Sequence, residues 1–253
     1  MYLIEVKKIN GVCGWRQLFL EDMMDKKTDS EDNFNILPVH RSKEQAIKAY
    51  NKISKFYDYT EGIFEKKYVN MALKQLEIKE GENVLEIGFG TGNALIKIAE
   101  LVGGSGDVYG IDISPKMLEI TDKKVKSKAL SDRVTLVCGD ATTLPYHDKK
   151  FDAVFMSFTL ELFDTPEIPK ILSEIKRVLK PDGRLGVVSM SKENGNSVFL
   201  KIYEWAHIRF PNYIDCRPIF AAASIKDAGF EIKRKIRIKT IVLPSEIVIG
   251  IKK

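Results

Sequence analysis

Apolar runs alternate with amphipathic helical patterns from residue 83 to residue 190, and this alternation constrains the fold more than any other feature. Strands are expected at 83–87, 108–111, 134–137, 151–158 and 185–190. Such strand–helix units, with mostly unbroken apolar strands, predict a parallel sheet covered by helices on both faces. Two further strands, 230–238 and 241–251, are separated only by Lys239 and Thr240 and must form an antiparallel hairpin. We therefore predict a doubly wound α/β fold with a mostly parallel seven-stranded sheet and an antiparallel terminal hairpin.

The chain of 253 residues, 44% of them hydrophobic, suits one such domain with a modest extension. Residues 1–41 are polar in their second half, and we expect them to form an N-terminal extension. Residues 42–253 then form a single domain. Its expected parts, in chain order, are N-terminal helices at 42–80, a core at 81–190, further helices at 191–229 and the C-terminal hairpin at 230–253.

The cysteines and the N-terminus indicate a reducing compartment. Cys13, Cys138 and Cys216 are odd in number and far apart, so they form no plausible disulfide framework or metal-binding pair. Residues 1–20 lack the continuous apolar segment of a signal peptide, and no uncharged apolar run reaches the length that spans a bilayer. We therefore expect a cytoplasmic protein with no transmembrane segment and no metal site.

The formal net charge of +5 is concentrated near the C-terminus, where residues 230–253 hold seven Lys or Arg and two Glu. In this stretch Ile232, Ile236 and Ile238 are expected on one face of a strand, with basic residues on the other. One interpretation is a patch for an anionic lipid surface or RNA. The other, which we favour, is a half-buried strand with a solvated face.

A glycine-rich turn follows the strand at 83–87, with glycines at Gly88, Gly90 and Gly92. Glycine is needed where backbone approaches a ligand closely or adopts positive φ, and free amides at a helix start favour an anionic group. Dinucleotide enzymes carry a related turn, but their last glycine would fall on Asn93 here. The turn therefore favours a ligand other than NAD, and an NAD(P)-dependent oxidoreductase is the alternative class.

Acidic residues end the next two strands. Asp112 lies about 20 residues after the turn, where a carboxylate can accept hydrogen bonds from both hydroxyls of a ribose. Asp140, with the backbone amide of Ala141, could bind an exocyclic amine. Residues 155–163, at the end of the fourth strand, are expected to lie at the same edge of the sheet as Asp112 and Asp140.

Four motifs in this order resemble class I S-adenosylmethionine-dependent methyltransferases: EIGFGTGN, GIDISPKML, GDATTLPYHDKKFDAV and LKPDGRL. Together with residues 49–58, they are most similar to the ubiquinone/menaquinone C-methyltransferase group, and the resemblance covers residues 45–190. It implies a Rossmann-like transferase that uses S-adenosyl-L-methionine and methylates a small-molecule or lipid-like acceptor, with a quinol or phenol favoured. An aminophospholipid or RNA acceptor, and a non-catalytic subunit of a methyltransferase pair, are the alternatives.

The resemblance also implies roles by position at the methionine end of the cofactor. Gly88, Gly90 and Gly92 would cradle this end, and Glu86 would orient its amino group. Ser157 would lie near the sulfonium. At the nucleoside end, Asp112 would hold the ribose, Ile113 would pack on the adenine, and Asp140 and Ala141 would bind the adenine amine and ring nitrogen. Tyr50 and Tyr57 would form part of a lid.

The segment after the fourth strand departs from the family pattern Asn/Ser-Phe-Gly-Leu-Arg-Asn, because here it reads Ser-Phe-Thr-Leu-Glu-Leu-Phe over 157–163. A base is needed only when the acceptor must lose a proton. Glu161 and His207 are the candidates, the alternatives being a capping carboxylate and a packed histidine. Arg217 is interpreted either as a ligand of an anionic acceptor or as a capping residue.

Overall fold

The computed structural model describes residues 36–37, 39, 44–45, 47–48, 63–193, 203, 205, 207, 209, 216–238 and 244–253. The strands of the sheet are β1 (Asn83–Ile87), β2 (Asp107–Asp112), β3 (Val134–Cys138), β4 (Phe151–Ser157), β5 (Leu179–Met190), β6 (Phe230–Ile238) and β7 (Ser245–Lys252). The α-helices with defined bounds are α3 (Ile63–Leu76), α4 (Asn93–Val102), α5 (Pro115–Ser127), α6 (Ile168–Val178) and α8 (Ala221–Asp227). Two short 3-10 turns are η2 (Gly103–Ser105) and η3 (Leu160–Leu162).

The strand order is β3-β2-β1-β4-β5-β7-β6, which confirms the predicted seven-stranded sheet. Neighbouring strands from β3 to β5 are parallel, and β7 runs antiparallel between β5 and β6. The chain moves outward from β1 to β3 and then crosses back to β4 on the other side of β1. Strand order therefore reverses between β1 and β4, and ligands of open α/β sheets bind outside the carboxyl ends of strands at such a point.

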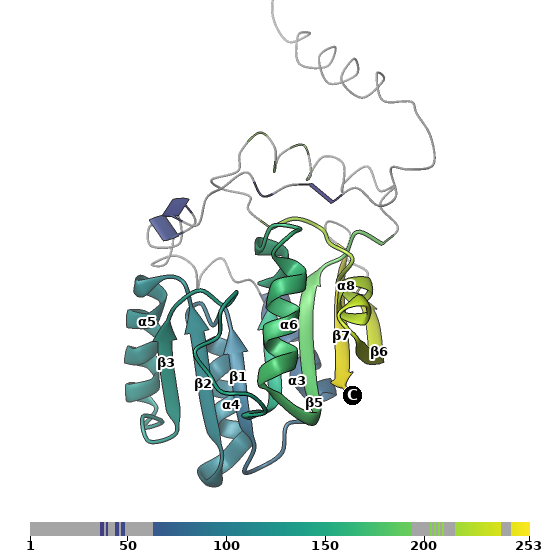
Figure 1. Ribbon diagram of the computed structural model, residues 1–253. Helices are drawn as coiled ribbons and strands as arrows, with labels where there is room; N and C mark the ends of the chain where they lie inside the picture. The colour runs from purple at the N-terminus through teal and green to yellow at the C-terminus, as the bar shows by residue number, and fades with distance from the viewer. Residues whose placement is uncertain are drawn as a thin grey trace, which may run out of the picture. The chain divides into compact units, whose positions relative to one another are not determined.

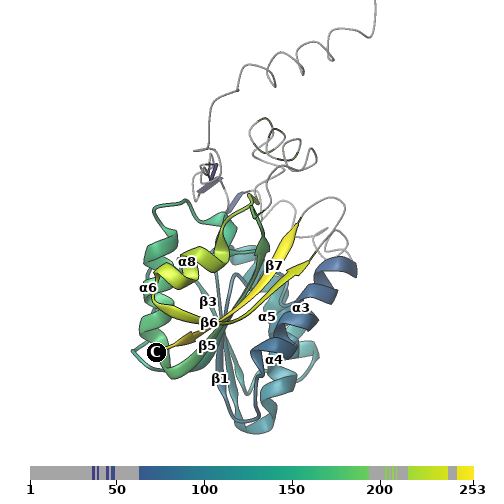
Figure 2. The same ribbon diagram turned by 90° about the vertical axis from the view of Figure 1, so that its right-hand side faces the viewer.

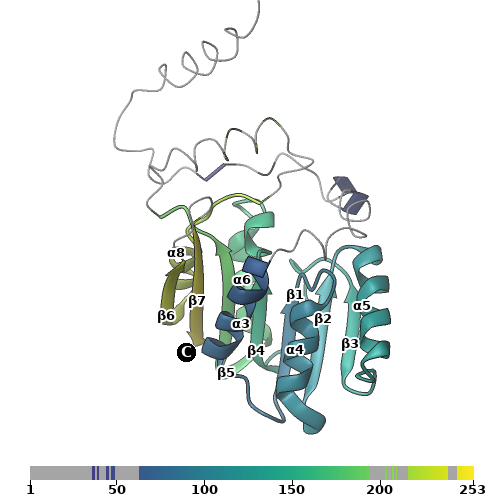
Figure 3. The same ribbon diagram turned by 180° about the vertical axis from the view of Figure 1, so that it is seen from behind.

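Helices cover both faces of the sheet (Figure 1). Seen along the sheet, α6 and α8 lie on one side and α3, α4 and α5 on the other (Figure 2). The view from behind shows α3, α4 and α5 across that second face (Figure 3). Each face buries its own apolar cluster, one containing the α6 residues and the other the α3 and α4 residues. Burial of both sheet faces explains why the parallel strands are almost unbroken apolar runs.

Local sequence explains the helix starts and faces. Ser114 caps α5, because its Oγ accepts a hydrogen bond from the Met117 amide at 3.2 Å, and Pro115 occupies the first helical position. The apolar stripe of α6 is wholly buried, and its members are Ile168, Ile171, Leu172, Ile175 and Val178. Spacings of three and four residues place this stripe on one helix face against the sheet.

The C-terminal strands differ from the expectation in their alternation and start. The pairing register of β6 shifts between Ile232 and Arg234, so Ile232 packs on the α6 face while Ile236 and Ile238 pack on the other. The expectation of all three isoleucines on one face is wrong, because an extra residue in a strand reverses the direction of every later side chain. β7 begins at Ser245, and residues 239–243 lie outside the described residues.

Carboxylates of neighbouring segments pair with the basic side chains of β6. Lys233 Nζ lies 3.2 Å from a Glu77 oxygen, and Arg237 Nη2 lies 2.6 Å from a Glu193 oxygen. Lys235 also pairs with Glu193. These ion pairs reduce the net positive field of the strand and support the interpretation of a half-buried strand with a solvated face.

Helix α3 (Ile63–Leu76) lies within the range 42–80. The division of the chain at residue 41 and the lid function of 42–80 stay predictions. Tyr50 and Tyr57, the two lid candidates, lie outside the described residues.

Candidate active site

The turn after β1 is built from three left-handed glycines. Gly88, Gly90 and Gly92 have φ of 72°, 52° and 79°, values that side chains with a Cβ adopt only with strain. A Cβ at Gly92 would lie 2.5 Å from Thr121 Cγ2, and one at Gly88 would overlap the side chain of Thr159. Only glycine therefore fits this turn, which brings bare backbone to the carboxyl edge of the sheet at the reversal of strand order.

Asp112, at the end of β2, is tied to this turn. Its Oδ2 accepts a hydrogen bond from the Gly90 amide and its Oδ1 one from the Ser114 amide, each at 2.9 Å. Burial raises the pKa of the Asp112 carboxyl, and the two amide hydrogen bonds partly oppose this by favouring the anion. Each carboxylate oxygen has more than one acceptor site, so a half-buried Asp112 can still accept hydroxyl groups of a ligand.

The ends of β2 and β3 bring the predicted nucleoside residues together. The Gly139 amide donates to the Asp112 carbonyl at 2.9 Å, and the Cys138 thiol lies 3.6 Å from the Ile113 carbonyl. Asp140 Oδ1 accepts the Thr142 amide at 2.9 Å and so shapes the turn that follows β3. Ala141 lies within that turn and is buried. Ile113 and Asp140 are both half-buried at this edge.

The end of β4 closes on the glycine turn. Phe158 has a positive φ of 48°, and Thr159 Oγ1 donates to the Ser157 carbonyl at 2.9 Å. This turn places the Thr159 side chain against Gly88. Ser157 is half-buried beside it, and Glu86 is buried in β1, two residues before Gly88. Thr159 occupies a position at which the family pattern has glycine. The sequence shows this departure from the pattern, but only the folded structure shows that the Thr159 side chain contacts Gly88.

The two candidate bases are both buried. Glu161, in η3, is fully buried, and its Oε1 accepts the Met190 amide at 3.1 Å, which links η3 to the end of β5. His207 has helical backbone and an exposure of only 2%. A buried carboxylate that holds a backbone amide supports the fold at this place. A catalytic role for Glu161 or His207 stays a prediction.

Arg217 is a buried clamp between distant segments. Its guanidinium donates to the Leu37 carbonyl at 2.7 Å, to Thr165 Oγ1 at 3.2 Å and to the Phe163 carbonyl at 2.5 Å. Burial lowers the pKa of Arg217, and the nearby carboxylates of Asp164 and Glu161 oppose that shift. The structure thus supports the capping interpretation of Arg217, which joins the segment at 36–39 to the loop after η3.

Arg217→Met is expected to lower the free energy of unfolding by about 3 kcal/mol, because the carbonyls of the half-buried residues Leu37 and Phe163 lose their charged donor. Denaturant unfolding followed by circular dichroism measures this change. Lys123→Met serves as the control, since Lys123 is 72% exposed and its helix pair with Glu119 contributes little. Equal midpoints for the two variants would show that the buried clamp contributes nothing to stability.

Residues 84–183 match the family described as methyltransferase domain. The chain is 39% identical over 140 residues to a demethylmenaquinone methyltransferase of Lactobacillus johnsonii, across 55% of this chain and 56% of that relative. It is 33% identical over 177 residues to the demethylmenaquinone methyltransferase of Anoxybacillus flavithermus, across 68% of this chain and 73% of the relative. This chain belongs to the class I S-adenosylmethionine-dependent methyltransferases of the menaquinone group. The family predicted from the four motifs is thus confirmed.

Solved structures confirm the fold of this methyltransferase. A SAM-dependent methyltransferase from Aquifex aeolicus superposes with a TM-score of 0.56 at 24% identity, over 73% of this chain and 89% of the other. The [4+2]-cyclase SpnF superposes with a TM-score of 0.71 at 19% identity, over 87% and 98% of the two chains. Because this fold also occurs in a protein described as a cyclase, fold likeness alone does not identify the reaction. The sequence relatives carry the family assignment, which sets aside the NAD(P)-dependent oxidoreductase.

Proposed function

We propose that this methyltransferase transfers a methyl group from S-adenosyl-L-methionine to a ring carbon of a reduced quinol of the demethylmenaquinol type. The observation that carries the proposal is the identity of 33% to 39% with relatives that are named demethylmenaquinone methyltransferases. A quinol also agrees with the small or lipid-like acceptor that the motifs imply.

The residues at the carboxyl edge of the sheet fit the cofactor. The three left-handed glycines place bare backbone at the carboxyl edge of the sheet, and Asp112 combines two backbone hydrogen bonds with remaining acceptor capacity. We propose that Gly88, Gly90 and Gly92 cradle the methionine end and that Asp112 holds the ribose. In the same proposal Ile113, Asp140 and Ala141 bind the adenine, Glu86 and Ser157 lie at the methionine end, and the lid tyrosines are Tyr50 and Tyr57.

The cofactor supplies an electrophilic methyl group on a sulfonium sulfur, and the protein supplies alignment and a proton acceptor. A quinol ring carbon becomes nucleophilic when the adjacent hydroxyl gives up its proton. After the methyl group bonds to that carbon, the hydrogen on the same carbon leaves as a proton and the quinol oxygen regains one, which restores the aromatic quinol. We propose Glu161 and His207 as the acceptors of that proton. Because both side chains are buried, this role requires the quinol hydroxyl to enter the same buried region.

Two measurements test the proposed function. Calorimetric titration with S-adenosylmethionine should show micromolar binding, with no binding of NADH or NADPH. Incubation with labelled S-adenosylmethionine should then methylate a demethylnaphthoquinol with a short prenyl chain, and should fail with the same compound in its oxidised form. Transfer to phosphatidylethanolamine or to RNA, without transfer to any quinol, would overturn the proposed acceptor.

Among the residues that the structure describes, no helix has the length and apolar character needed to cross a bilayer. We propose a cytoplasmic location with peripheral contact to the membrane that would hold a prenylated quinol. Sedimentation of the protein with anionic vesicles tests that contact.

A further inference from the structure

The connection between β3 and β4, residues 139–150, carries two of the proposed adenine ligands, Asp140 and Ala141. We call it the adenine loop. It consists of turns and bends without a helix or strand of its own. A loop that lacks internal ladders keeps a fixed shape only through contacts with neighbouring elements. The residues that provide these contacts therefore decide where Asp140 and Ala141 lie.

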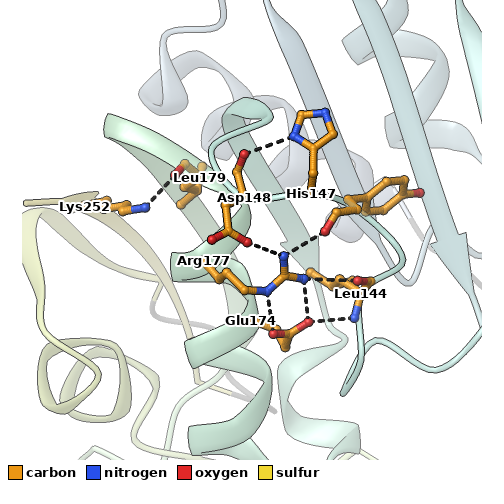
Figure 4. A network of polar contacts seen from close by, with 8 residues as sticks. Leu144, His147, Asp148, Glu174, Arg177, Leu179 and Lys252 are labelled. Carbon is orange, nitrogen blue, oxygen red and sulfur yellow. Dashed lines mark hydrogen bonds and ion pairs between the residues drawn. The ribbon is translucent and has the colours of Figure 1, made fainter.

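Arg177, near the end of α6, provides three of these contacts (Figure 4). Its guanidinium donates to the carbonyls of Leu144 at 3.1 Å and Tyr146 at 2.8 Å, and to Asp148 Oδ1 at 2.8 Å. These acceptors lie within five consecutive positions of the adenine loop. One side chain thus satisfies two backbone carbonyls and a carboxylate of a segment that is far from it in sequence.

Glu174 completes the arrangement from the preceding turn of the same helix. It accepts Arg177 Nε–H and Nη2–H, both at 2.8 Å, and its Oε2 also accepts the Leu144 amide at 2.9 Å. The guanidinium beside it lowers the pKa of Glu174. A planar fork with five donors can hold a carboxylate and two carbonyls together, whereas a lysine ammonium cannot.

Further contacts fix the end of the loop. The amides of Lys149 and Lys150 donate to the carbonyls of Arg177 and Val178 at 3.0 and 2.8 Å. The Tyr146 ring packs edge-on against Phe151, with centroids 5.0 Å apart. The loop is thus held to α6 at 144–150, while Asp140 itself shapes the turn at its start.

We infer that Arg177, oriented by Glu174, is a positioning residue for adenine recognition. By holding Leu144 and Tyr146 against α6, it keeps Asp140 and Ala141 in place for the exocyclic amine and the ring nitrogen. Without it, cofactor binding must also order the loop, so affinity falls and the selectivity for the amine falls with it. This inference rests on the proposed function, because it assumes that the cofactor is S-adenosylmethionine.

The test compares Arg177→Gln with wild type by calorimetry and steady-state kinetics. The dissociation constant and KM for S-adenosylmethionine should rise about tenfold, because binding must then also order the loop that Arg177 no longer holds. The kcat should change less than twofold. Binding of S-adenosylhomocysteine relative to its analogue without the exocyclic amine should move toward equal affinity, a change that general destabilisation does not produce.

Arg184→Gln is the matched control. Arg184 on β5 donates to the Leu76 carbonyl at 2.8 Å and to Glu82 at 2.5 Å, and among the described residues it makes no hydrogen bond or ion pair with the adenine loop. We expect a similar loss of thermal stability with unchanged affinity and unchanged selectivity for the amine. Glu174→Gln replaces the first variant if Arg177→Gln does not fold.

The outcomes separate the two proposals. If wild type does not bind S-adenosylmethionine, the proposed function fails. If wild type binds it and both arginine variants keep wild-type affinity and amine selectivity, the positioning role is overturned while the proposed function stands. Equal losses of affinity in both variants also overturn the positioning role, because stability alone would then explain them.

Discussion

Asp112→Ala is expected to weaken S-adenosylmethionine binding at least a hundredfold. The substitution removes the acceptor proposed for two ribose hydroxyls, and hydrogen bonds to a charged group contribute about 1.5–3 kcal/mol each. It also removes the partner of the Gly90 amide, which holds the glycine turn to β2. Calorimetric titration of the purified variant measures the loss directly.

Asp152→Ala is the control for this result. Asp152 also accepts a backbone amide, from Asn83 at 2.9 Å, and pairs with Lys180 at 2.8 Å, but it lies near the start of β4. The start of a parallel strand is at the edge opposite to the ligand site. We expect lower stability with unchanged affinity. Similar affinities of the two variants would remove Asp112 from the cofactor site.

Gly88→Ala is expected to lower the free energy of unfolding by about 2–5 kcal/mol and to abolish cofactor binding. A left-handed φ of 72° costs a residue with a Cβ about 1–2 kcal/mol. Overlap of the new methyl group with Thr159 adds about 1–3 kcal/mol. Denaturant unfolding measures the stability, and calorimetry measures the binding.

A double-mutant cycle separates the two causes. Thr159→Ala removes both Thr159 atoms that come closest to the new methyl group, and the remaining Cβ would lie at 3.0 Å. The double variant should recover the steric part and keep the backbone part. Gly104→Ala is the control, because a Cβ there meets no atom within 4 Å, and its effect should stay within about 0.5 kcal/mol. Purely additive effects at 88 and 159 would exclude the steric explanation.

Much of the fold was predictable because its signals are local. An apolar run marks a buried parallel strand, and a proline after serine marks the start of α5. The sequence does not locate the register shift in β6, although Arg234 interrupts the alternation of Ile232, Ile236 and Ile238. The pairing with β7 decides where the extra residue is accommodated, and a single strand does not reveal its partner.

The same division applies to the site. Gly88, Asp112 and Asp140 could be proposed from sequence because each follows a strand, and parallel strands bring their carboxyl ends to one edge. Their conformations and hydrogen bonds agree with that proposal. Glu161 was selected as a carboxylate that follows the fourth strand, near the carboxyl edge of the sheet. Its burial against the Met190 amide depends on β5, which lies later in the chain.

The sequence by itself determined the order of strands and helices along the chain, the glycine turn, the acidic residues at the strand ends and the methyltransferase family. Each of these depends on residues close together in the chain. Only the tertiary structure decided that Arg217 clamps Leu37, that Thr159 packs on Gly88 and that Arg177 holds the adenine loop. Those contacts join residues 29 to 180 positions apart, and their donors and acceptors meet only because the sheet and its helices bring distant segments together.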